Sequence, residues 1–200
     1  LCAQSIEDLI LFHGPETVAA LIAEPVSASS LAAVPGNPYW PMIREICTKY
    51  GVLLIADEVI TGFGRTGHMF AVEHWGVVPD LMTVAKGITS SYLPLAATIC
   101  TTHVAEAFAG EQNIFRQALT FGGHPVCASV ALSNIEIIES EQLVQNSAVM
   151  GEYFLNKLKE MKEVHPIIGD VRGLGLLLGI EIVKDRKTKE NFSPDSGITE

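Results

Sequence analysis

The sequence is poor in charged residues and in cysteine. Only 18% of its 200 residues are charged, whereas 48% are hydrophobic, a balance that excludes a disordered chain and indicates extensive burial. Acidic residues outnumber basic ones by 23 to 13, and the net charge of −10 argues against binding to nucleic acid or anionic membranes. The four cysteines are far apart and form no C-x-x-C pair. Their spacing disfavours a zinc ribbon or a dense disulfide framework and favours a reducing compartment, so we expect a cytoplasmic protein.

Long apolar runs and targeting signals are also missing. No run approaches the roughly 18 to 20 residues of a membrane span, so we expect no membrane association through a spanning helix. The first ten residues, LCAQSIEDLI, have no basic region and no initiating Met, which predicts a piece of a longer protein rather than a signal peptide. The six histidines show no metal-ligand spacing, and we expect no metal site.

Short apolar runs alternate with amphipathic stretches in the first half of the chain. Tyr39–Tyr50 has apolar residues at helical spacing, and Gly51 stands where a helix C-cap belongs. Ser5–Phe12 resembles the end of another helix. Unbroken apolar runs on either side of the 39–50 helix predict a parallel or mixed α/β sheet with both faces covered. The predicted strands are Val18–Ala23, Val52–Ala56, Leu81–Ala85 and Leu95–Thr101.

The pattern changes in the second half of the chain. Val126–Ile138 and Gln142–Lys162 are predicted helices, and strand-like sequence returns only in Gly175–Val183. This change predicts a domain boundary near residues 138–165, and the polar residues 184–200 are predicted to form a loop.

Two motifs resemble nucleotide-binding sequences without their context. Leu53–Glu58 has the form of a Walker B strand, but no G-x-x-x-x-G-K-[ST] loop occurs in the chain. Gly62–Gly67 matches G-x-G-x-x-G, yet five residues separate it from the preceding strand and no long helix follows. The second motif is better interpreted as a tight turn that glycine permits.

Asp57 and Lys86 stand out because each directly follows an apolar strand. In open α/β sheets, ligands bind beyond the carboxyl ends of the strands. The first 156 residues contain only two lysines, and the other, Lys49, suits the C-terminal turn of a helix. A lysine at an apolar strand end is costly unless its desolvation is used chemically, for example in a Schiff base. Together, the acid and the lysine predict a ligand site.

Five blocks of sequence extend this pair along most of the chain. In order they are AEPV at 23–26, LLIADEVITGFGRTG at 53–67, PDLMTVAKG at 79–87, TFGGHP at 120–125 and DVRGLG at 170–175. Their order and spacing resemble those of the class III (ω-amino acid type) aminotransferases, which depend on pyridoxal 5′-phosphate (PLP). The resemblance implies a partial fold-type I large domain, with a mostly parallel sheet between helices, over residues 1–140. It also implies that residues 141–200 contain a connecting helix and the start of a smaller α+β C-terminal domain.

The resemblance also implies residue roles. Lys86 resembles the lysine that holds PLP as a Schiff base and then moves the substrate proton. Asp57 resembles the partner of the pyridine nitrogen, and Val59 the residue that packs on one face of the ring. Thr120 resembles the threonine that reaches the cofactor phosphate of a neighbouring subunit, with Gly122 allowing close backbone approach. These roles imply a homodimer with shared active sites.

Three further positions resemble family positions less directly. Glu24 resembles an acid near the cofactor, whereas Arg65 suits the turn or a subunit interface. Ile60 stands where many relatives have Gln, and an apolar residue here resembles members that use pyruvate. The phosphate cup, the stacking aromatic residue and the carboxylate-binding arginine of the family lie outside these 200 residues.

The predicted function is therefore transfer of an amino group from an amine or ω-amino acid to a keto acid such as pyruvate. Alternatives within the family, which share the same residues, are a decarboxylase, a racemase or an aminomutase. A different alternative is a non-catalytic fragment or binding module that keeps the fold without turnover.

Overall fold

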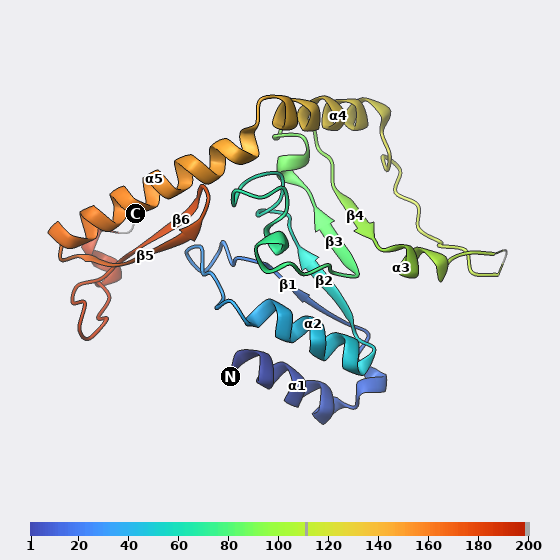
Figure 1. Ribbon diagram of the computed structural model, residues 1–200, viewed down its shortest axis with the longest axis horizontal. Helices are drawn as coiled ribbons and strands as arrows, with labels where there is room; N and C mark the ends of the chain where they lie inside the picture. Colours follow the sequence, from blue (N-terminus) through green and yellow to red (C-terminus); the bar gives the residue numbers. More distant parts are fainter. Residues whose placement is uncertain (111, 199–200) are drawn as a thin grey trace.

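The computed structural model, which describes residues 1–110 and 112–198, is built on a four-stranded mixed sheet (Figure 1). The first three strands run parallel and the fourth is antiparallel to the third. In sheet order the strands are β1 (Ala20–Ala23), β2 (Leu53–Asp57), β3 (Leu81–Val84) and β4 (Ala97–Cys100). The α/β class and the mixed sheet predicted from the apolar runs are confirmed.

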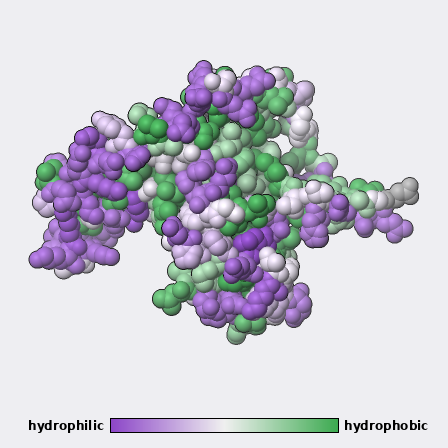
Figure 2. All heavy atoms as spheres, viewed as in Figure 1, coloured by the Kyte–Doolittle hydropathy of each residue, from purple (hydrophilic) through white to green (hydrophobic). Residues whose placement is uncertain are grey.

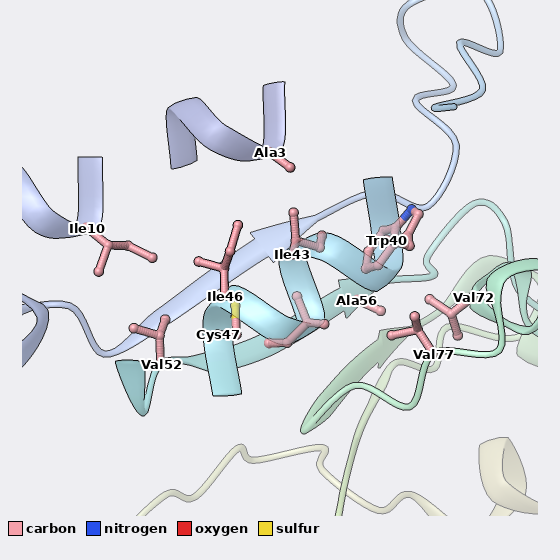
Figure 3. Close-up of a cluster of buried hydrophobic side chains, with 11 residues drawn as sticks. Ala3, Ile10, Trp40, Ile43, Ile46, Cys47, Val52, Ala56, Val72 and Val77 are labelled. Atoms are coloured by element: carbon pink, nitrogen blue, oxygen red, sulfur yellow. The ribbon is translucent and has the colours of Figure 1, made fainter. Parts of the chain in front are cut away.

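Helices α1 (Cys2–His13) and α2 (Tyr39–Tyr50) cover one face of this sheet (Figure 1). Helix α2 ends at Gly51, whose φ of 68° permits the left-handed C-cap predicted from the sequence. The indole Nε1 of Trp40 donates a 3.3 Å hydrogen bond to the Pro25 carbonyl, so the largest core side chain has no unpaired polar atom. Figure 3 shows the resulting cluster, which includes Ala3, Ile10, Trp40, Ile43, Ile46, Cys47, Val52, Leu54, Ala56, Val72 and Val77.

Side chains alternate between the two faces of a strand, which determines the residues that lie on the sheet face opposite α2. Leu54 and Ala56 are fully buried in the cluster beneath α2, so Ile55 and Asp57 lie on the opposite face of β2. On β1, Ile22 pairs with Ile55 and remains more than half exposed. The face opposite α2 therefore carries Asp57 at its carboxyl edge.

Helix α4 (Pro125–Ser140) packs at the carboxyl end of β3. Its Ala131 forms a small cluster with Val84 and Ile88. Between α4 and the short α3 (Thr102–Glu106), residues 112–124 run in a projecting segment away from the sheet (Figure 1).

Helix α5 (Leu143–Val164) packs on an antiparallel hairpin of β5 (Ile168–Leu174) and β6 (Leu177–Ile182). Leu158, Ile168 and Val171 form a core separate from that beneath the main sheet. Purple, hydrophilic spheres predominate over this part in Figure 2. A division of the chain near residue 140 stays a prediction.

The hairpin differs from the sequence prediction, which placed one strand at Gly175–Val183. Gly175 instead forms the turn, with φ of 53°, and the preceding residues form β5. Two glycines and an aspartate make β5 a poor strand by composition, so it depends on pairing with β6 and on packing against α5. Helix α1 also begins at Cys2, earlier than the predicted segment.

The described residues also contain four short 3₁₀ turns. They are Pro15–Thr17, Ala71–Trp75, Lys86–Ile88 and Pro194–Ser196. No helix in the described part of the chain is long and apolar enough to cross a membrane.

Truncation of Ile43 tests the core under α2. Ile43 is fully buried, and Ile43→Ala should lower the free energy of unfolding by about 2 to 5 kcal/mol because a cavity replaces its side chain. The neighbouring Met42 is partly exposed, and Met42→Ala should cost less than about 1.5 kcal/mol. Urea denaturation followed by tryptophan fluorescence measures both; equal losses would contradict the assigned packing.

Candidate functional site

Two carboxylates lie at the carboxyl edge of the parallel strands. Asp57 is the last residue of β2, and Glu24 directly follows β1. Because Ala23 pairs with Ala56, the next residues of the two strands meet at the same level of the sheet. The crevice beyond this edge is the expected ligand position in an α/β sheet.

The Asp57 carboxylate is fixed in orientation. Its Oδ1 accepts hydrogen bonds from the backbone N–H of Val59 at 3.1 Å and from the hydroxyl of Thr83 at 3.2 Å. Thr83 pairs with Asp57 across β2 and β3, so both side chains lie on the face opposite α2. Among the described residues both contacts engage Oδ1, which leaves Oδ2 to accept a further donor.

Lys86 begins the turn that follows β3 and has a left-handed φ of 45°. Its side chain lines a cavity of about 590 Å³, a size suited to a cofactor or small substrate. The walls of this cavity come from the turns after β2 and β3, the end of α4, the start of α5 and the turn between β5 and β6. They include Ile60, Phe63, Arg65, Ser90, Ser91, Asn146, Ser147 and Leu176.

The structure does not bring all the predicted site residues into this cavity. Asp57 and Val59 lie at the adjacent strand end rather than among the lining residues. Glu24 lines a separate cavity of about 470 Å³ and accepts hydrogen bonds from Ser27 and Ala28. Thr120 and Gly122 are exposed on the projecting segment before α4.

The glycine-rich turn joins the sheet to the second part of the chain. Gly64 and Gly67 have φ of 88° and 89°, and the Arg65 carbonyl accepts hydrogen bonds from Ser147 and Leu176. Only the 3₁₀ turn Ala71–Trp75 follows, so the helix required by a dinucleotide fingerprint is not present there. The interpretation of Gly62–Gly67 as a tight turn agrees with this geometry.

Glu58 is a buried acid whose only sequence signal is its place in a Walker B-like acidic pair. It is fully buried, and its carboxylate accepts hydrogen bonds from the Thr61 hydroxyl and from the Val72 N–H at 2.9 Å. Burial raises the pKa of Glu58 above its ordinary value, although these hydrogen bonds oppose the shift. Glu58 therefore closes the loop between β2 and the Ala71–Trp75 turn instead of facing a ligand.

Two residues that support the site were not predicted from the sequence. Thr83 orients Asp57, and its only sequence signal is a hydroxyl at the register position beside a strand-end acid. Asn134 is a buried polar residue on α4 that hydrogen-bonds to the turn carrying Lys86. A single amide within an apolar helix was its only signal.

Comparison with known proteins identifies the family. The model of the family "Aminotransferase class-III" matches residues 1–197. The chain belongs to the class III aminotransferases. A taurine–pyruvate aminotransferase from Bilophila wadsworthia is 48% identical over 192 residues, which cover 94% of this chain and 42% of that protein. This chain thus spans about two-fifths of the length of the curated relatives it matches.

Solved structures of transaminases show the same arrangement. A thermostable (S)-enantioselective omega-transaminase from Thermomicrobium roseum matches with a TM-score of 0.92 and 46% identity, over 96% of this chain and 43% of that one. An amine transaminase from an uncultivated Pseudomonas species in a PLP-bound form matches with a TM-score of 0.93 and 41% identity, over 98% and 45% of the two chains. The predicted family and the partial large-domain fold are confirmed, and the family implies PLP.

The buried Glu58 predicts a pH dependence of stability. Because burial raises its pKa above 4.5, the folded protein keeps a proton that the unfolded chain has already released, so stability falls as pH rises through this window. Glu58→Gln removes this titration while keeping an acceptor for Val72. We expect the melting temperature of the variant, relative to the unsubstituted protein, to rise from about pH 4.5 to neutrality.

Differential scanning fluorimetry at several pH values measures this difference. Glu45→Gln on the exposed side of α2 serves as the matched control, because it removes a carboxylate that is not buried. A melting-temperature difference for Glu58→Gln that stays constant with pH would contradict the titration.

Proposed function

We propose that the protein is a PLP-dependent aminotransferase that transfers an amino group from an amine or ω-amino acid to a keto acid. The observation that carries this proposal is the placement of Asp57 and Lys86 at the carboxyl ends of the adjacent parallel strands β2 and β3. The fixed carboxylate with one unused oxygen fits a protonated ring nitrogen, and the cavity beside Lys86 has room for the cofactor.

Each residue then has a defined task. Lys86 would hold the cofactor through its Nζ amine, and the same amine, when free, would carry the proton to and from the substrate α-carbon. Asp57 would keep the ring nitrogen protonated, and Val59 would pack against the ring. When bound, PLP supplies an electron sink for the charge left at that carbon.

The apolar wall of the cavity supports the substrate class. Ile60 lines the cavity beside Lys86, and its side chain offers no hydrogen bond to a ligand. This agrees with the resemblance to members that use pyruvate, and the taurine–pyruvate aminotransferase is named for that acceptor. We therefore propose pyruvate as the acceptor.

The projecting segment supports assembly as a homodimer with shared sites. Phe115, Leu119 and Phe121 are between 62% and 82% exposed there, which is unfavourable unless another surface covers them. In Figure 2, hydrophobic spheres lie along this segment. Thr120 and Gly122 lie among these side chains and outside the cavity of their own chain, so we propose that they contact the cofactor phosphate of the partner subunit.

Borohydride reduction tests the assignment of Lys86. The complete protein is incubated with PLP, reduced and digested, and peptide mapping should find the pyridoxyl group on Lys86, with no label at that peptide in Lys86→Ala. An absorption band at about 410 to 430 nm should accompany binding. A label on another lysine, or none, would contradict the proposal and favour a non-catalytic module.

The reaction type is tested separately, because a decarboxylase, racemase or aminomutase would use the same residues. Conversion of pyruvate to alanine with an amine donor supports transamination, whereas loss of CO₂ or change of configuration without an acceptor supports the alternatives.

A mixing experiment tests the shared sites. Thr120→Ala and Lys86→Ala should each lower activity strongly, since one removes a phosphate contact and the other the cofactor linkage. When subunits exchange, a hybrid dimer has one site with both defects and one with neither, so its activity should recover to about half that of the unsubstituted dimer. No recovery despite confirmed exchange would show that Thr120 does not serve a partner's site.

A further inference from the structure

Three residues of the turn after β3 have left-handed backbone conformations although none is glycine. The φ angle is 45° at Lys86, 48° at Ser90 and 64° at Ser91. L side chains avoid this region because Cβ crowds the backbone, so such residues persist only where the surrounding structure holds them. The turn that carries Lys86 therefore depends on contacts from outside itself.

Asn134 on α4 supplies such contacts. Its Nδ2 donates hydrogen bonds to the carbonyl oxygens of Gly87 at 2.8 Å and Ile88 at 3.2 Å. Its Oδ1 accepts a 2.7 Å hydrogen bond from the Ser90 hydroxyl. Carbonyl oxygens can only accept, so only this orientation of the amide satisfies all three partners. Every one of these partners lies within four residues of Lys86.

The opposite side of the turn is closed by the glycine-rich turn. A Cβ at Gly87 would lie 3.0 Å from Cβ of Phe63 and 3.3 Å from the carbonyl oxygen of Gly62, which leaves little space for the backbone to shift. Asn134 itself is only 9% exposed, so water cannot readily replace its hydrogen bonds. The Lys86 turn is thus held between the Asn134 amide and Phe63.

We propose that Asn134 is a positioning residue for Lys86. By holding the carbonyls of Gly87 and Ile88, its amide fixes the left-handed conformation that directs Lys86 into the cavity. The inference rests on the proposed function, since it gives Asn134 a role in cofactor attachment through Lys86. A structural role alone would affect the stability of α4 without a specific effect on Lys86.

The test compares Asn134→Ala with a matched control on the same helix. Ser133 is exposed on α4, and Ser133→Gly weakens the helix through glycine's poor propensity without contacting the Lys86 turn. In the complete protein without cofactor, hydrogen exchange at the amides of residues 87–91 should be about tenfold faster in Asn134→Ala and unchanged in Ser133→Gly. Equal exchange in both variants would overturn the proposal.

Cofactor attachment gives a second readout. After PLP is added, borohydride-trapped pyridoxyl should accumulate on Lys86 about tenfold more slowly in Asn134→Ala, because a misplaced amine reacts poorly. With saturating cofactor, kcat should fall by a similar factor while KM changes less than about threefold. The proposal would be overturned if the trapping rate of Asn134→Ala lay within about twofold of the unsubstituted rate, or if Ser133→Gly slowed trapping equally.

Two additional variants keep the test decisive. Asn134→Asp has nearly the original shape but places an acceptor against two carbonyl oxygens. Pyridoxyl should therefore be trapped on Lys86 more slowly in this variant than in Asn134→Ala. Faster trapping in Asn134→Asp would show that Asn134 only fills space and would overturn the proposal. If Asn134→Ala does not fold, Ser90→Ala removes one hydrogen bond and should slow trapping about threefold, and no slowing would overturn the inference. Absence of label on Lys86 in the unsubstituted protein would instead overturn the proposed function.

Discussion

Parallel pairing of β2 with β3 is the constraint on which the candidate site depends. Parallel strands end at the same edge of a sheet, so the register that places Asp57 beside Thr83 also brings the turn after β3, with Lys86, to that edge. A shift by one residue would place Asp57 on the face covered by α2. The buried contacts of Leu54 and Ala56 with α2 prevent this shift, so the hydrophobic core determines where the chemistry can occur.

Two kinds of support surround this edge. The Thr83 hydroxyl and the Val59 N–H orient the Asp57 carboxylate, whereas buried side chains hold the loops. Glu58 closes the loop that follows β2, and Asn134 holds the turn that follows β3. Neither buried residue reaches the cavity, yet both limit how its walls can move. The site is therefore defined as much by polar groups that satisfy backbone atoms as by those offered to a ligand.

The features predicted correctly from the sequence are those that a local pattern of residues encodes. Strand-end positions revealed Asp57 and Lys86, and helical spacing with a terminal glycine revealed α2. Sequence reasoning missed β5, because Gly169, Asp170 and Gly173 are poor strand formers and the strand is stabilised by distant residues of β6 and α5. It also missed Asn134, whose importance comes from residues more than forty positions away. Sequence spacing could not establish a role for Thr120 or Glu24 at the site. Neither residue lines the cavity that Lys86 lines in the same chain.

Helix α4 connects two regions that the proposed dimer would place in different active sites. Its N-terminus follows the segment with Thr120, and Asn134 lies about 13.5 Å further along the helix axis. Because one continuous helix carries both, the position of α4 relates the Asn134 amide to the segment that ends at its first turn. In the proposed dimer, one helix would thus connect the lysine of its own subunit with a contact made to the partner subunit.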